Sequence, residues 1–267
     1  MKALLEGGCD VRAVGLAEKE GGGTGRRLAG RVEALAREGG VPVVQLAAIA
    51  AEAVAGIAVY EPEAIVAGCF PWRLPPVLLG LPRWGCLNVH PSLLPVGRGP
   101  EPVFWTLRRG ERRTGATVHV MDEGLDTGPV VAREAIATPE GLRAPELEER
   151  LMALGGRLVL EALPRLAAGE ITPLAQDSTR ATAAPVPAAG DWVIPTNLPA
   201  RWAYTFGRGV ATLGGPLVVQ IGGTGERYGV RDALGFGGEE MDERVMDEGD
   251  GVMRVRFRPG WVRFRVR

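Results

Sequence analysis

The chain reads LNVHPSLLP from Leu87, RGPEPVFW from Arg98 and TGATVHVMDEGLDTG from Thr114. Asn88 and His90 are one residue apart at the end of an apolar run, so on a strand both side chains point to the same face. Asp126 follows in a glycine-flanked, turn-forming segment, which suits a carboxylate on a loop beside a strand end. An Asn amide can donate to a developing oxyanion, a His can transfer a proton, and an Asp can orient that His or accept a proton. These residue types suit acyl transfer without a nucleophilic side chain.

Short apolar runs alternate with helix-like segments through the first two thirds of the chain. The strand-like runs are VRAVGL, VPVVQL, AIVAGCF and CLNVH, and the clearest helical patterns are RLAGRVEALAREGG and the segment from about Ala144 to Ala168. This alternation predicts an α/β fold with a Rossmann-like, mostly parallel sheet. Ligands of such sheets bind beyond the carboxyl ends of the strands, which is where Asn88 and His90 are expected.

Three motifs, in this order, resemble the family of formyltransferases that use 10-formyltetrahydrofolate. They are N-x-H-x-S-L-L-P at Asn88–Pro95, T-G-x-T at Thr114–Thr117 and L-D-x-G at Leu125–Gly128. Separately placed motifs in the right order are more specific than a single glycine motif. The resemblance implies formyl transfer from 10-formyltetrahydrofolate to an amine, with no metal, and a catalytic trio of Asn88, His90 and Asp126.

The resemblance also implies a substrate-binding set. We expect the pterin ring of the folate near the apolar segment upstream of the catalytic strand, and further substrate contacts from the SLLP loop. His119 fits a structural role better, with a smaller chance that it touches the folate. The expected substrate-binding residues are Phe70, Trp72, Arg73, Leu74, Ser92, Leu93, Leu94, Pro95 and His119. Taken singly, a His near a strand end is usually structural and an Asp before Thr-Gly is usually a turn-former.

The acceptor stays open between members of the family. The glycine-rich loop with Arg26 and Arg27, the RGPEPVFW segment and an extra β-domain favour methionyl-tRNA formyltransferases, so methionyl-tRNA is the expected acceptor. The HPSLLP, TVH and LDTGPVV segments also resemble the glycinamide ribonucleotide enzyme, and the amino-sugar enzymes share RG-x-x-P. A non-catalytic nucleic-acid-binding relic is the contrasting class. A plain surface loop explains the glycine-rich segment equally well.

The sequence predicts a second domain after Gly169. Residues 1–175 are expected to form the catalytic domain, 176–195 an extended linker, and 196–267 a small OB-like β-barrel of short strands. From Met253 onward there are six arginines and no acids, and Arg254, Arg256 and Arg258 alternate with apolar residues. On a strand they share one face, which is either a solvated face or a phosphate-contacting, tRNA-binding surface.

Composition sets broad limits. A net charge of −1 excludes a globally basic nucleic-acid binder, and three cysteines without CxxC spacing favour a reduced, cytoplasmic, metal-free chain. Apolar runs are too interrupted to span a membrane, and we expect a monomer. The KALLEGG start resembles the end of a helix, so the first strand of such a sheet is missing, and we expect the native protein to begin upstream.

Overall fold

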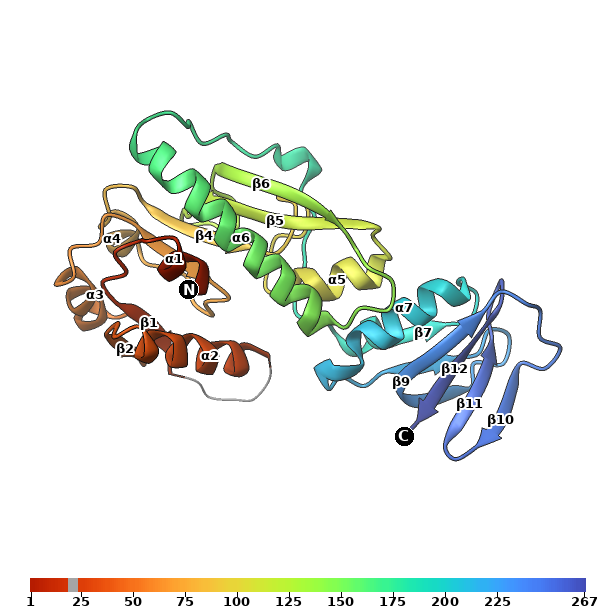
Figure 1. Ribbon diagram of the computed structural model, residues 1–267. Helices are drawn as coiled ribbons and strands as arrows, with labels where there is room; N and C mark the ends of the chain where they lie inside the picture. The colour runs from red at the N-terminus through yellow and green to blue at the C-terminus, as the bar shows by residue number, and fades with distance from the viewer. Residues whose placement is uncertain (19–23) are drawn as a thin grey trace. The chain divides into compact units, whose positions relative to one another are not determined.

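The computed structural model describes residues 1–18 and 24–267, with side chains described again from residue 29 (Figure 1). It contains two compact units. The first comprises Met1–Pro102, Thr114–Ile136 and Glu149–Ala184, and the second comprises Val103–Arg113, Ala137–Glu148 and Pro185–Arg267. This division differs from the expected boundaries, because residues 176–184 pack within the first unit and two internal segments join the C-terminal residues.

The N-terminal part of the first unit is a pair of parallel strands with helices. Strands β1 (Val14–Ala17) and β2 (Val43–Leu46) pair in parallel, with Val14 opposite Val43. Buried Val14, Leu16 and Ala36 form their small core. The helices of this part are α1 (Lys2–Glu6), α2 (Thr24–Glu38) and α3 (Ala51–Ala58). The KALLEGG segment is therefore helical, as predicted.

A four-stranded sheet in the order β3-β4-β5-β6 positions the motif residues. Strand β3 (Ile65–Gly68) runs parallel to β4 (Cys86–His90), which runs antiparallel to β5 (Arg113–Val120); β6 (Val130–Ala137) follows. Helix α4 (Pro76–Leu79) connects β3 to β4. Within the described part of the chain, β1 and β3 each pair on one side only, and the strand expected upstream of Met1 stays an expectation.

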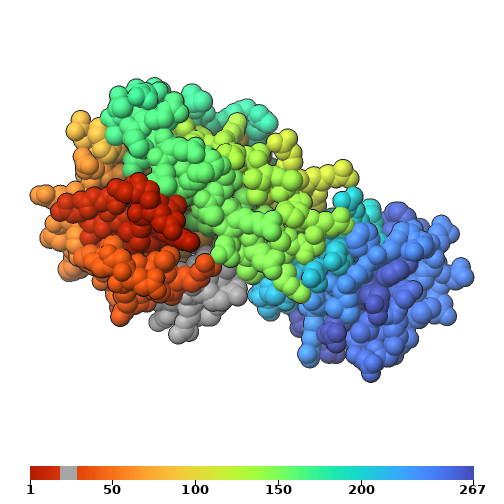
Figure 2. Space-filling model, viewed as in Figure 1, coloured from red at the N-terminus to blue at the C-terminus, as the bar shows by residue number. Residues whose placement is uncertain are grey.

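Helix α6 (Ala144–Ala167) covers one face of this sheet. Leu158 and Val159 pack with Leu87 and Val89 of β4 in one buried cluster, and Gly155 lies so close to Val89 that a larger residue would collide with it. Helix α1 lies against α6, where Leu4 joins the same cluster (Figure 2). Among the helices described, none has both the length and the apolar character needed to cross a bilayer.

The second unit contains a mixed six-stranded sheet in the order β10-β11-β12-β9-β8-β7. Strands β7 and β8 pair in parallel, and the pairs β10-β11, β11-β12, β12-β9 and β9-β8 are antiparallel. Phe104 packs against Trp192 and Phe206 in its core. Its helices are α5 (Pro102–Arg109) and α7 (Ala200–Val210), and its strands are β7 (Val193–Pro195), β8 (Val218–Gln220), β9 (Arg227–Gly237), β10 (Val245–Gly249), β11 (Val252–Arg256) and β12 (Trp261–Val266).

Candidate active site

Strand β4 presents Asn88 and His90 on the sheet face away from α6. Leu87 and Val89 point into the core under α6, so the residues between them must face the other way. The register places Asn88 opposite His119 and His90 opposite Thr117 on β5. Directly opposed side chains on one face of an antiparallel pair are close neighbours. The strand pairing therefore brings both histidines of the chain to one place.

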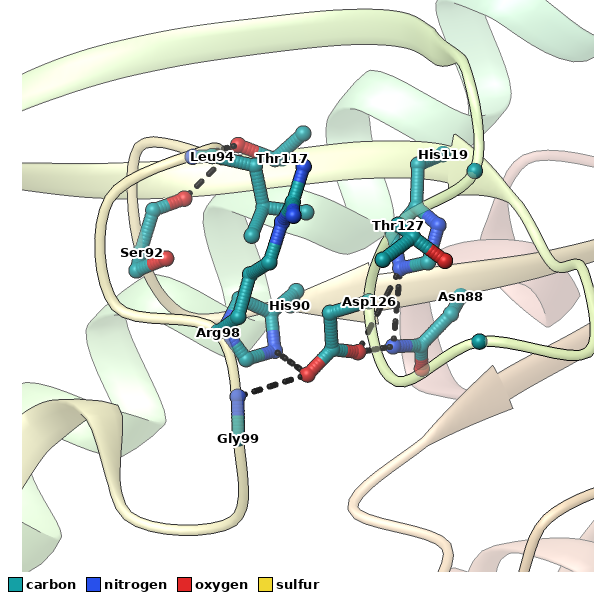
Figure 3. Close-up of polar contacts among 12 residues, drawn as sticks. Asn88, His90, Ser92, Leu94, Arg98, Gly99, Thr117, His119, Asp126 and Thr127 are labelled. Carbon is teal, nitrogen blue, oxygen red and sulfur yellow. Dashed lines mark hydrogen bonds and ion pairs between the residues drawn. The ribbon is translucent and has the colours of Figure 1, made fainter. Parts of the chain in front are cut away.

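Asp126 reaches these residues from the loop that joins β5 to β6 (Figure 3). Its backbone is left-handed, with φ of 54°, and Gly128 packs against the backbone of Val120 so closely that no side chain would fit there. Its carboxylate accepts hydrogen bonds from the Gly99 N–H at 2.8 Å and from Asn88 Nδ2 at 3.3 Å. The side chain is 10% exposed, so most of the carboxylate is shielded from solvent and a small part can still be reached by a substrate.

His119 fixes the orientation of the Asn88 amide. Its Nδ1 lies 3.1 Å from the Val120 carbonyl, which can only accept, so Nδ1 bears the hydrogen. Nε2 then has a lone pair and accepts from Asn88 Nδ2 at 3.2 Å. Both hydrogens of the Asn88 amide therefore point into the Asp126–His119 pair. The two contacts are long for N–H hydrogen bonds, so an incoming oxyanion can compete for one of these hydrogens.

His90 is buried and neutral at pH 7. Burial lowers the pKa of its imidazole below the ordinary value of 6.5, although Asp126 and the Gly97 carbonyl oppose this shift. Nε2 lies 2.7 Å from the Gly97 carbonyl and donates to it. The remaining lone pair is on Nδ1, which lies 3.7 Å from Asp126 Oδ2. Two proton acceptors thus stand side by side, and together they can hold one proton brought by a substrate.

Asp126 is ionised in this surrounding. Burial by itself would raise the pKa of its carboxyl, but the hydrogen bond that the Gly99 N–H donates favours the ionised form, and the net direction is a lowered pKa. His119 Nε2 lies 3.6 Å from Asp126 Oδ1. The site therefore combines an ionised carboxylate, a neutral imidazole and an amide donor.

The SLLP loop is held by internal hydrogen bonds rather than left open. The Ser92 hydroxyl donates to the Val96 carbonyl, Thr117 accepts from the Leu94 N–H, and Arg133 donates to the Leu94 carbonyl. The side chains of Ser92, Leu94 and Pro95 are buried and that of Leu93 is partly exposed, so substrate contact by these residues stays a prediction. His119 is 2% exposed and contacts Asn88, which is the structural role expected for it, and its contact with the folate stays a prediction.

The segment after β3 is divided between core and surface. Phe70 and Trp72 are half-buried and meet edge to face with ring centroids 5.5 Å apart, while Arg73 is exposed. Leu74 is buried in a core cluster with Leu78, and its predicted contact with substrate stays a prediction. The two aromatic rings are the members of this segment that offer a flat apolar surface.

The arginine-rich hairpin has the predicted alternation, but two of its arginines are paired with a carboxylate on the neighbouring strand. On β11 the arginines face away from buried Val255, yet Glu248 on β10 accepts from Arg254 at 2.7 Å and from Arg263 at 2.6 Å. Arg256 donates to the carbonyls of Met241 and Asp242. Arg258 is exposed. Partial burial opposes it, but the two guanidinium groups lower the pKa of Glu248. The side chains of Arg26 and Arg27 lie outside the described residues.

No sequence pattern predicted that residues 176–184 would pack beside the candidate site. Residues expected to form a free linker lie along the Arg98–Gly99 loop: Arg98 N–H donates to the Thr182 carbonyl, and Gly99 is so close to the Ala184 carbonyl that a side-chain carbon would lie 2.7 Å from it. Gln176 in the same segment donates to the carbonyls of Asp126 and Gly128. A single Gln in a Pro- and Ala-rich stretch shows no periodicity that could have revealed this contact.

Comparison with known proteins agrees with this geometry. The family model described as formyl transferase matches residues 12–163. A methionyl-tRNA formyltransferase of Geobacter metallireducens is 35% identical over 94% of this chain and 84% of its own length.

Two solved structures share the fold. HypX from Aquifex aeolicus in complex with tetrahydrofolic acid has a TM-score of 0.65 at 18% identity, over 96% of this chain and 44% of that one. The N-formyltransferase from Helicobacter canadensis, in complex with folinic acid and dTDP-3-aminofucose, has a TM-score of 0.55 at 15% identity, over 67% and 65%. With its motifs gathered at one strand end and this family match over more than half of its length, the chain belongs to the formyltransferase family.

Proposed function

We propose that this chain transfers the formyl group of 10-formyltetrahydrofolate to the amino group of methionyl-tRNA. The observation that supports this proposal most is the convergence of Asn88, His90 and Asp126 at the end of β4. The acceptor is supported by the similarity to a methionyl-tRNA formyltransferase, which extends over 94% of this chain. We further propose that these three residues are catalytic. We also propose that the protein is a monomer and acts in the cytoplasm.

Asn88 would stabilise the oxyanion. When the amine nitrogen attacks the formyl carbon, the formyl oxygen gains negative charge and needs a donor. The Asn88 amide has two hydrogens in long contacts at 3.2 and 3.3 Å, and it can turn one toward that oxygen while the other keeps the side chain in place. Loss of one such donor typically slows a reaction on the order of a hundredfold or more.

Asp126 and His90 would handle the proton. The attacking amine must lose one proton as its new C–N bond forms, and the folate N10 must gain one as its bond to the formyl carbon breaks. Asp126 Oδ2 and His90 Nδ1 are both acceptors, 3.7 Å apart, so the proton released by the amine can reside between them and then pass to N10. No net proton is gained or lost by the protein.

The folate would bind beside the aromatic pair after β3. Phe70 and Trp72 lie at the carboxyl end of the strand that neighbours β4, which is the end where sheets of this type bind ligands. The exposed faces of these rings suit a flat heterocycle. Arg73 is exposed in the same segment and can meet a carboxylate of the folate tail.

For tRNA, the basic residues differ in their freedom to bind phosphate. Arg254 and Arg263 are already paired with Glu248, so a phosphate would have to displace that carboxylate, whereas exposed Arg258 has no such carboxylate partner among the described residues. We propose Arg26, Arg27, Arg254, Arg256 and Arg258 as the RNA contacts.

The test offers 10-formyltetrahydrofolate with methionyl-tRNA, glycinamide ribonucleotide and nucleotide-linked amino sugars in parallel. Formylation of methionyl-tRNA with a kcat/KM at least about a hundredfold above the other acceptors supports the proposal. A small amine as the preferred acceptor overturns the tRNA assignment and keeps formyl transfer. Failure with every acceptor, while the protein is folded, overturns the proposed activity.

A further inference from the structure

The amide of Gln176 joins the two chain segments that meet at the Asp126 carboxylate. Its Oε1 accepts from Arg98 Nε at 3.1 Å and from Nη2 at 2.8 Å. Its Nε2 donates to the Asp126 carbonyl at 2.9 Å and to the Gly128 carbonyl at 2.7 Å. A Gln side chain has two donor hydrogens and one oxygen that can accept two bonds, so all four of its hydrogen-bonding positions are used.

The partners leave one orientation for this amide. Guanidinium groups only donate and carbonyls only accept, so the oxygen must face Arg98 and the nitrogen must face the Asp126–Gly128 turn. The residue after Arg98 is Gly99, whose N–H donates to the Asp126 carboxylate at 2.8 Å. The Gln176 amide therefore sets the distance between the Arg98–Gly99 segment, which donates a hydrogen bond to the Asp126 carboxylate, and the turn that contains Asp126.

We propose that Gln176 is a positioning residue that holds the Asp126 turn against the Arg98–Gly99 segment. This inference rests on the proposed catalytic role of Asp126. A support for this turn is useful because Asp126 has a left-handed backbone, a conformation that residues other than glycine adopt uncommonly. Without the amide, two carbonyls of the turn lose their donor and the guanidinium loses its acceptor, so both segments can separate.

Among the residues that the structure describes, no other side chain is seen to bind both Arg98 and the Asp126–Gly128 turn. Asp177 follows Gln176 directly, but its carboxylate accepts from the N–H and hydroxyl of Thr179. The charged groups next to the amide are the Arg98 guanidinium and, on the far side of the turn, the Asp126 carboxylate with His90 and His119. Gln176 contributes no charge, so its effect on Asp126 comes through the position of the turn.

The experiment compares Gln176→Met, Gln176→Glu and a matched control, Gln220→Met. Gln220 also accepts from an arginine, Arg227, but belongs to the sheet of the other unit. The first readout is hydrogen exchange at the Gly99 amide, which needs no substrate. We expect Gln176→Met to speed this exchange by about tenfold or more and the control to leave it unchanged. Gln176→Glu can still accept from Arg98 but cannot donate to both carbonyls, so it should behave like Gln176→Met.

The second readout is the pH profile of kcat/KM for formyl transfer. With the Gly99 contact loosened, the Asp126 carboxyl loses a donor that favours its ionised form, so the acid limb of the profile should move to higher pH and kcat/KM should fall by about tenfold or more. Unchanged Gly99 exchange and an unmoved acid limb in folded Gln176→Met would overturn the inference. If wild type formylates no acceptor, the proposed function fails, and the exchange measurement alone still decides the role of Gln176.

Discussion

Replacing Asp126 with Asn should separate the charge of this side chain from its shape. The carboxylate accepts from the Gly99 N–H at 2.8 Å and from Asn88 Nδ2 at 3.3 Å. An amide can accept through its oxygen from one of these donors, but its NH₂ group then faces the other donor. Exchanging a charge-assisted bond for a neutral one, and facing two donors, should lower the free energy of unfolding by about 1–2 kcal/mol. This corresponds to a decrease in Tm of roughly 2–8 °C.

The effect on catalysis should be larger than the effect on stability. The variant lacks the carboxylate that accepts the amine proton, so kcat/KM for formyl transfer should fall by about a hundredfold to ten-thousandfold, measured well below its Tm. Asp122→Asn is the matched control, because Asp122 lies in the same loop and its carboxylate accepts from Gly124 and Thr127 of that loop. If Asp126→Asn retains more than about a tenth of wild-type kcat/KM, Asp126 does not act on the proton.

Four further results are expected. Asn88→Ala and His90→Ala should each lower kcat/KM by at least about a hundredfold without unfolding the chain, and the double variant should be far from additive; steady-state kinetics and circular dichroism check this. Because burial lowers the pKa of His90 below its unfolded value, the unfolded chain binds more protons there, so stability should fall as pH drops through 6.5; urea titrations at several pH values should show a flatter fall in His90→Asn. Gly155→Ala should destabilise the chain by about 1–3 kcal/mol through collision with Val89, whereas Gly30→Ala, with open space around it, should stabilise it by up to about 1 kcal/mol in the same titrations. Glu248→Gln should strengthen tRNA binding and steepen its salt dependence by about one to two units of slope, because two guanidinium groups become free; an unchanged slope removes that part of the hairpin from the RNA surface.

The spacing of apolar residues predicted the strands and helices whose buried face is visible within the segment itself. The predicted run CLNVH is β4, and the predicted helix from Ala144 is α6, because apolar spacing reports which face of an element is buried. Strand β10 was not predicted. Its VMDEG sequence is acidic and weakly apolar, and it forms because β11 offers an edge to pair with, a condition that lies outside the segment itself.

The candidate site was predictable only in its residue types. Spacing placed Asn88 and His90 on one face, and the order of motifs suggested Asp126. The register that sets His119 opposite Asn88, and the chain path that brings Gln176 to the Asp126 turn, depend on contacts between segments far apart in sequence. The same limit applies to the arginine hairpin: its alternation was visible, but the pairing with Glu248 requires knowing which strand lies next to β11.

The arrangement of acceptors explains why a neutral His90 is useful here. If the imidazole were protonated, it would form an ion pair with Asp126 and both groups would lose their capacity to take a proton from an amine. Burial prevents this by lowering the pKa of His90, while the hydrogen bond from the Gly99 N–H favours the ionised form of Asp126. The Gly97 carbonyl adds to the effect, because it holds the imidazole hydrogen on Nε2 and leaves Nδ1 free beside the carboxylate. The loop from His90 to Gly99 thus provides both the backbone acceptor that sets the tautomer and the backbone donor that sets the charge.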